Sequence, residues 1–76
     1  MNTSEIIEAK VTGTLDPIDG TSGFSDVFNG KRVSLYVYYY NKTVIVSIKG
    51  LAAKEFNYSN KNVSGEIIQY IVSQTK

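Results

Sequence analysis

The chain has 76 residues and a formal net charge of +1, and it contains neither histidine nor cysteine. It therefore lacks the usual general base at neutral pH, the commonest metal ligand and all thiolate chemistry. We expect one domain over residues 1–76, with no enzyme activity, no catalytic residue, no metal site and no cofactor.

The first predicted element is a strand over residues 6–15, where apolar and polar residues alternate with a period of two. Residues 16–20, which contain proline, aspartate and glycine, predict a turn that ends this strand. The three apolar residues of the segment 24–28 have the spacing of one helical face, and we expect a short helix there. The following Asn29-Gly30 pair predicts a helix stop or a turn.

The strongest predicted strand covers residues 32–40, and a second strand covers residues 43–49 after a turn at Asn41-Lys42. Both segments contain many β-branched and aromatic residues, which favour strands. Residues 51–58 fit a helix and an edge strand about equally well, so that both interpretations stay open.

A final helix is predicted over residues 65–74, with Ser64 as a suitable N-cap. Its apolar stripe contains Ile67, Ile68, Ile71 and Val72. Together these elements predict an α+β domain. We expect a small antiparallel sheet of three to four strands, a short helix after the first strand, and the C-terminal helix packed on one face.

The near-zero net charge hides an uneven distribution along the chain. Residues 1–28 carry five acidic residues and one basic residue, a net of −4, whereas residues 29–63 carry six basic residues and one acidic residue, a net of +5. An acidic N-terminal third is therefore set against a basic hairpin. Such a two-signed surface suits pairing with another copy or with a partner.

Alternate residues of the strand predicted over 32–40 are tyrosines, and they would share one of its faces. Tyrosine buries a large ring while its hydroxyl group remains available to water or to a partner, and it is enriched at interface hot spots. We expect this face to contact a protein partner or another copy. The predicted partner-binding residues are Tyr36, Tyr38 and Tyr40, surrounded by Arg32, Lys42 and Lys49.

Two other functions remain open at this point. Aromatic side chains on a sheet face, with cations nearby, can stack the bases of single-stranded nucleic acid. The net charge of +1 is low for such a protein, so that nucleic-acid binding is the alternative rather than the first expectation. A second alternative is an oligomeric structural or assembly protein.

The small size of the chain also bears on assembly and location. A domain of this length buries only about 60% of the surface of its unfolded chain, and we expect a homo-oligomer because association would bury more apolar surface. No apolar run approaches the ~18 residues that cross a membrane, and the first ten residues contain Glu5 and Glu8 rather than a basic leader. We therefore expect a cytoplasmic protein that does not insert into membranes.

Residues 28–37, Phe-Asn-Gly-Lys-Arg-Val-Ser-Leu-Tyr-Val, resemble the Phe-Asn-Gly-Lys-x-Val-Ser-Ile-x-Val segment of YonK-like proteins, which are small chains from Bacillus phages and prophages. Residues 11–16, Val-Thr-Gly-Thr-Leu-Asp, resemble the Val-x-Gly-x-x-Asp strand of that family. The likeness covers about residues 11–37, across a shorter connecting segment, and residues 41–76 extend beyond it. It implies a phage or prophage origin, with host cytoplasm as the location, and it carries over no activity.

These observations lead to one expected function. The chain is expected to be a small non-enzymatic protein-binding module. If the resemblance holds, it is a phage or prophage accessory protein that modulates or inhibits a host factor, such as a defence system. The expected mechanism is occlusion of the partner's surface by the tyrosine-bearing hairpin.

Overall fold

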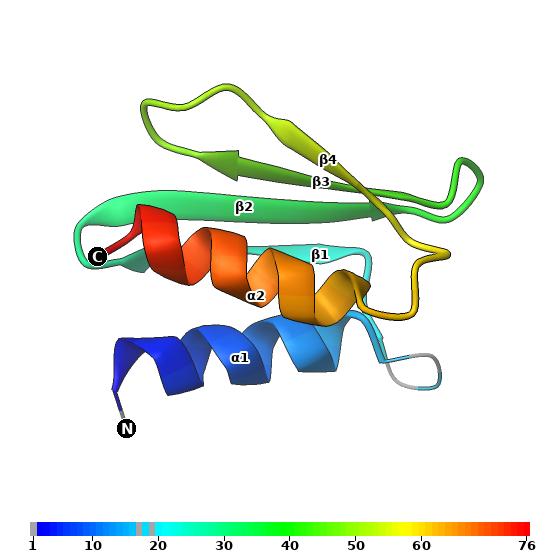
Figure 1. The fold of residues 1–76 in the computed structure, drawn as a ribbon, viewed down its shortest axis with the longest axis horizontal. Helices are drawn as coiled ribbons and strands as arrows, with labels where there is room; N and C mark the ends of the chain where they lie inside the picture. Colours follow the sequence, from blue (N-terminus) through cyan, green and yellow to red (C-terminus); the bar gives the residue numbers. More distant parts are fainter. Residues whose placement is uncertain (1, 17, 19) are drawn as a thin grey trace.

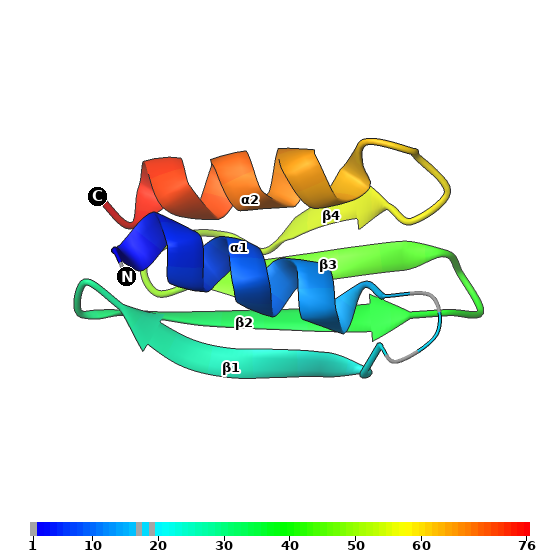
Figure 2. The same ribbon diagram turned by 90° about the horizontal axis from the view of Figure 1, so that it is seen from below.

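The computed structural model of the protein describes residues 2–16, 18 and 20–76. Four strands form one antiparallel sheet in the order β1-β2-β3-β4, so that strands adjacent in the chain are also adjacent in the sheet. The two helices lie together on one face of this sheet (Figure 1, Figure 2). The elements are α1 (Thr3–Thr14), β1 (Gly23–Phe28), β2 (Lys31–Tyr38), β3 (Thr43–Ile48), β4 (Lys54–Asn57) and α2 (Val63–Gln74).

The predicted α+β class is confirmed, with a four-stranded antiparallel sheet and a C-terminal helix on one face. The N-terminal helix lies before the first strand. It packs beside β1, whereas α2 packs beside β3 and β4, and the two helices contact each other. Figure 2 shows this helical layer in front of the sheet.

The strand predicted over residues 6–15 is wrong, because this segment forms α1. Ile7 and Val11 are fully buried one helical turn apart, whereas Ala9 and Gly13 are exposed. The predicted alternation counted both small residues as apolar positions facing a core. They bury no side chain, and the positions that do pack have helical spacing.

The short helix predicted over residues 24–28 is also wrong, because this segment lies in β1. Phe24 and Phe28 are four residues apart, a spacing that places two side chains on one face of a helix and equally on one face of a strand. Asn29 and Gly30 decide between the two, with φ angles of 51° and 80°. They form the two-residue turn of a hairpin that pairs β1 with β2.

The two predicted central strands are confirmed, with shorter bounds. The strand predicted over 32–40 is β2, which ends at Tyr38, and the strand predicted over 43–49 is β3, which ends at Ile48. The turn predicted at Asn41-Lys42 is longer than two residues, because the paired strands end at Tyr38 and Thr43.

The structure decides whether residues 51–58 form a helix or an edge strand, which the sequence left open. Residues 51–58 contain the edge strand β4 rather than a helix. The final helix α2 begins two residues before the predicted start, so that Asn62 rather than Ser64 occupies the N-cap position. Ser64 lies within the first turn, where its side chain does not cap the helix.

The core lies between the helical layer and the sheet. Its buried apolar side chains come from both helices and from β1, β2 and β3. They are Ile7, Val11, Phe28, Val33, Leu35, Val37, Val44, Val46, Ile48, Val63, Ile67 and Ile71. Each such side chain contributes about 1.5–3 kcal/mol when fully buried, and the whole set lies on one side of the sheet.

Candidate functional site

The opposite side of the sheet carries no helix (Figure 1). Successive residues of a strand point to opposite faces, and β2 shows the consequence directly. Leu35 is fully buried and Val37 is 6% exposed, whereas Tyr36 and Tyr38 are 49% and 48% exposed. We call this side the open face; its residues are Ser25, Val27, Arg32, Ser34, Tyr36, Tyr38, Thr43, Ile45, Ser47, Lys49, Glu55 and Asn57.

The centre of the open face combines an aromatic and a β-branched side chain. Tyr36 in β2 lies directly opposite Ile45 in β3, a cross-strand pairing that typically contributes about 0.2–1 kcal/mol. On its other side, Tyr36 lies opposite Gly23 of β1, where a Cβ atom would collide with the carbonyl oxygen of Leu35. The Tyr36 ring therefore has a β-branched neighbour on one side and bare backbone on the other.

A cationic end lies beyond this apolar centre. Arg32 and Lys49 are directly opposed across β2 and β3, where the Lys49 N–H donates to the Arg32 carbonyl oxygen at 3.0 Å. The Arg32 guanidinium group donates to Ser25 Oγ at 3.1 Å. A row of serines, in which Ser34 faces Ser47 across the strands, separates the cations from Tyr36. The small serine side chains leave a depression of about 500 Å³, lined by Val27, Gly30, Arg32, Ser34, Ser47 and Lys49.

The structure brings together four of the six predicted partner-binding residues. Tyr36, Tyr38, Arg32 and Lys49 share the open face. Tyr40 does not lie on the strand, since β2 ends at Tyr38, and its side chain is fully exposed in the loop that follows. Lys42 lies in the same loop, with a φ angle of 51°, at the opposite end of β2 from Arg32.

The basic segment 29–63 does not form one basic surface. Lys31 points toward the helical layer, where its ammonium group donates to the Gln74 carbonyl oxygen at 2.8 Å. Lys54 lies over the ring of Tyr70 in α2, with its nitrogen 4.9 Å from the ring centroid. The open face therefore receives only part of the positive charge that the sequence concentrates in this segment.

An ion pair joins the helical layer to the outer strand β1. Asp26 Oδ2 lies 3.1 Å from Lys10 Nζ, and Asp26 Oδ1 accepts a hydrogen bond from the Val27 N–H at 2.8 Å. These two contacts hold the pKa of Asp26 below its usual value. The hydrogen bond from the Val27 N–H is the largest cause, and the Lys10 ammonium group is the next. Part of the acidic N-terminal charge is thus neutralised within the chain.

Val27 and Ile45 belong to the open face but were missed as candidate binding residues. Val27 is 45% exposed and was hidden by the helix predicted over residues 24–28. Ile45 alternates with buried valines in the sequence, and only the pairing register shows that it lies beside Tyr36. The Asn29-Gly30 turn was the signal that could have revealed Val27 as a strand residue.

Comparison with protein-family models, with curated proteins and with solved structures gave no significant match to this chain. Within residues 2–16, 18 and 20–76, neither helix is long and apolar enough to span a bilayer. The same residues contain no cluster of three or more side chains of the metal-binding types. The open face offers tyrosine rings, hydroxyl groups, two cations at one end and the Glu55 carboxylate opposite Ile45. Together these groups can cover an apolar surface and pair with carboxylates at the cationic end.

Proposed function

We propose that this protein is a small binding module whose open face covers part of the surface of a partner protein. The observation that carries the proposal is the half-exposed pair Tyr36 and Tyr38 on the helix-free side of a rigid sheet. A tyrosine held on a strand has little conformational freedom to lose, and it buries a large ring on association. These are the properties of interface anchor residues.

The composition of the open face defines the chemistry of the partner. Tyr36 and Ile45 would contact an apolar patch, whereas Arg32 and Lys49 would pair with carboxylates at one side of it. Electrostatic complementarity of this kind sets orientation and the rate of association more than the affinity. Binding would act by occlusion, since no change of conformation is needed to present the face.

The resemblance of residues 28–37 to YonK-like proteins extends this proposal, whereas residues 11–14 of the likeness lie in α1 and not in a strand. It favours a phage or prophage origin and a host protein as the partner. In this form of the proposal, the covered surface belongs to a host factor, such as a component of a defence system, which binding inhibits.

The placement of the cations favours a protein partner over single-stranded nucleic acid. Proteins that bind single strands align cations along the path of the backbone, beside the stacking aromatic residues. Here Arg32 and Lys49 cluster at one end of the open face, and Lys31 and Lys54 lie on the helical side. Lys42 lies in the loop after β2. The cations at the open face thus lie at its two ends rather than in a track beside the tyrosines.

Capture from a lysate of the cells that encode the chain tests the proposal. The wild-type protein is compared with the double variant Tyr36→Ser/Tyr38→Ser and with Tyr40→Ser, which removes a fully exposed tyrosine ring outside the sheet. We expect the same protein to be retained by the wild type and by Tyr40→Ser, and its recovery to fall at least about tenfold with the double variant.

Two outcomes would overturn the proposal. One is equal recovery of the partner by all three proteins while circular dichroism shows that each is folded. The other is tight binding of a single-stranded oligonucleotide that weakens steeply with salt and that the double variant abolishes.

A further inference from the structure

The two outer strands of the sheet differ in how their free edges are protected. An edge strand presents unpaired backbone groups that can template pairing with another chain. In β1 the carboxylate of Asp26 accepts the Val27 N–H at 2.8 Å and also pairs with Lys10. One outward N–H of this edge is therefore already occupied by a carboxylate of the chain itself.

The edge of β4 is not blocked in this way. The Tyr58 N–H donates to the Lys42 carbonyl oxygen at 2.7 Å. Because backbone groups alternate in direction along an antiparallel strand, the N–H and carbonyl groups of Lys54 and Phe56 also face β3. The backbone of Glu55 consequently points outward. In an antiparallel ladder of this register, the N–H and carbonyl groups of Glu55 face away from β3.

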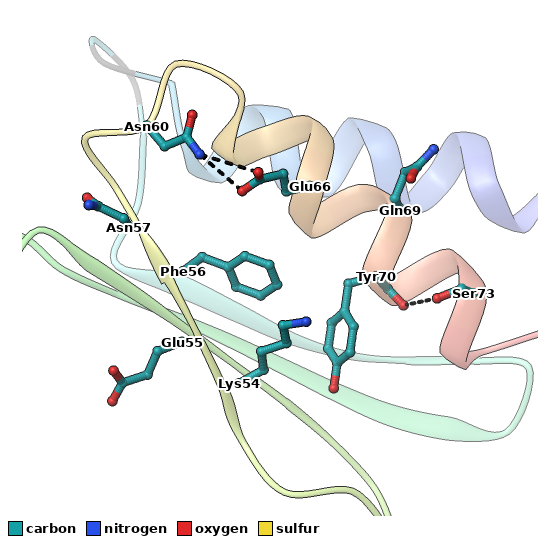
Figure 3. A pocket seen from close by; sticks show the side chains of 9 residues that line it. All are labelled: Lys54, Glu55, Phe56, Asn57, Asn60, Glu66, Gln69, Tyr70 and Ser73. Carbon is teal, nitrogen blue, oxygen red and sulfur yellow. Dashed lines mark hydrogen bonds between the residues drawn. The ribbon is translucent and has the colours of Figure 1, made fainter.

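A groove of about 630 Å³ runs between β4 and α2 at this edge (Figure 3). Its floor is aromatic, since the rings of Phe56 and Tyr70 lie 5.8 Å apart between centroids. The Lys54 ammonium nitrogen lies 4.9 Å from the Tyr70 centroid and 5.5 Å from that of Phe56. Figure 3 shows these three side chains pointing toward one another between the strand and the helix.

The groove has opposite charges at its two ends. Lys54 lies where β4 begins, and it forms no ion pair among the described residues. Glu66 of α2 lies toward the other end, where both of its carboxylate oxygens accept hydrogen bonds from Asn60 Nδ2 at 3.2 and 3.3 Å (Figure 3). A charge pattern with one cation and one anion at opposite ends is complementary to itself after rotation by 180°.

We propose that β4 pairs antiparallel with β4 of a second copy of this chain, about a two-fold axis at Phe56. The outward backbone groups of Glu55 then face those of Asn57 in the second copy. The Asn57 carbonyl oxygen already accepts the Asn60 N–H of its own chain at 3.1 Å, and its second lone pair would accept the contact from the other copy. Each Lys54 reaches Glu66 of the other copy, and the two Phe56 rings meet at the axis. The contact is isologous, since every interaction occurs twice.

Lys54 makes this pairing selective. A charged side chain on the core-facing side of an edge strand deters pairing with arbitrary strands, because pairing would remove the charge from water without a partner. The two-fold arrangement supplies Glu66 as that partner and therefore favours one register. The resulting dimer has one continuous sheet with both open faces on the same side, independently of what those faces bind.

The test is the monomer–dimer equilibrium of the full chain, measured by sedimentation from about 1 μM to about 1 mM. Lys54→Glu and Glu66→Lys each place like charges together, and we expect each to raise the dimer dissociation constant at least about tenfold. The doubly reversed protein Lys54→Glu/Glu66→Lys restores opposite charges, and its constant should return to within about threefold of the wild type.

Two further variants keep the result decisive. Glu55→Pro removes an outward N–H without removing a bond to β3, and it should also weaken the dimer. Tyr36→Ser/Tyr38→Ser should leave dimerisation unchanged. A wild-type chain that stays monomeric throughout overturns the proposal. So does a dimer that survives both single charge reversals and Glu55→Pro, or one that only the tyrosine variant dissociates.

Discussion

The two faces of β2 differ in what covers them. Val33, Leu35 and Val37 meet the helices and are at most 6% exposed, whereas Tyr36 and Tyr38, interleaved with them, stay half exposed. Folding requires only one apolar face of the sheet to be buried. Stability and the proposed binding therefore depend on opposite sides of one strand, and substitutions at neighbouring positions should affect one property without the other.

The largest effect is expected on the covered face. Leu35→Ala removes a fully buried side chain from the centre of the core and should lower the free energy of unfolding by about 2–5 kcal/mol. Urea denaturation followed by circular dichroism measures this loss. A loss below about 1 kcal/mol would show that the helical layer does not pack on the sheet as described.

A smaller effect is expected at the hairpin that sets the register of both faces. Gly30 has a φ angle of 80°, and Gly30→Ala should cost about 1–2 kcal/mol. The matched control is Gly13→Ala in α1, where a Cβ atom meets nothing within 4 Å. That change should stabilise the protein by about 0.5–1 kcal/mol, so that opposite signs distinguish the turn from the helix in the same denaturation experiment.

On the open face, a large aromatic side chain should contribute little to folding. Tyr36→Ser removes a half-exposed ring whose main neighbour is Ile45, and the expected loss of stability is below about 1 kcal/mol. Binding to a partner should nevertheless fall at least about tenfold. Urea denaturation measures the loss of stability of Tyr36→Ser, and a binding titration measures its loss of affinity. A loss of stability as large as that of Leu35→Ala would contradict the distinction between the two faces.

The smallest effect concerns the Lys10–Asp26 pair at the edge of the sheet. Because folding lowers the pKa of Asp26, its contribution to stability is present above the pKa of the unfolded chain, about 3.9, and is lost as pH falls through the lower folded value. Asp26→Asn should slightly flatten the fall in the urea midpoint between pH 6 and acidic pH. An unchanged acid dependence would contradict the role of this carboxylate.

The central strands could be predicted from the sequence because residues 32–40 and 43–49 alternate without ambiguity and are rich in β-branched and aromatic residues. The N-terminal elements could not. Ile7 and Val11 are four residues apart, and so are Phe24 and Phe28, a spacing that fits a helix and a strand equally. Local features beside these segments decide such cases.

For α1, the deciding feature is its cap. Asn2 Oδ1 accepts a hydrogen bond from the Glu5 N–H at 2.9 Å, and asparagine is among the residues that favour the N-cap position. For β1, it is the Asn29-Gly30 turn. These local signals outweigh an alternation that depends on alanine and glycine.

The candidate site could be predicted only in part. Tyr36 and Tyr38 follow from the alternation of β2, but Tyr40 was misplaced because nothing in the residue pattern marks the end of the strand at Tyr38. The proximity of Ile45 to Tyr36 depends on the register between strands. The groove beside β4 requires the position of α2, which is a property of the tertiary packing.

Photocrosslinking tests the central claim most directly, because it identifies the surface that the partner touches. A benzophenone amino acid is placed at position 36 on the open face or, as a control, at position 8, an exposed site on α1. We predict a covalent adduct between position 36 and a protein other than this chain, and no adduct from position 8. Adducts from position 8 alone, or only self-adducts from position 36, would contradict the account.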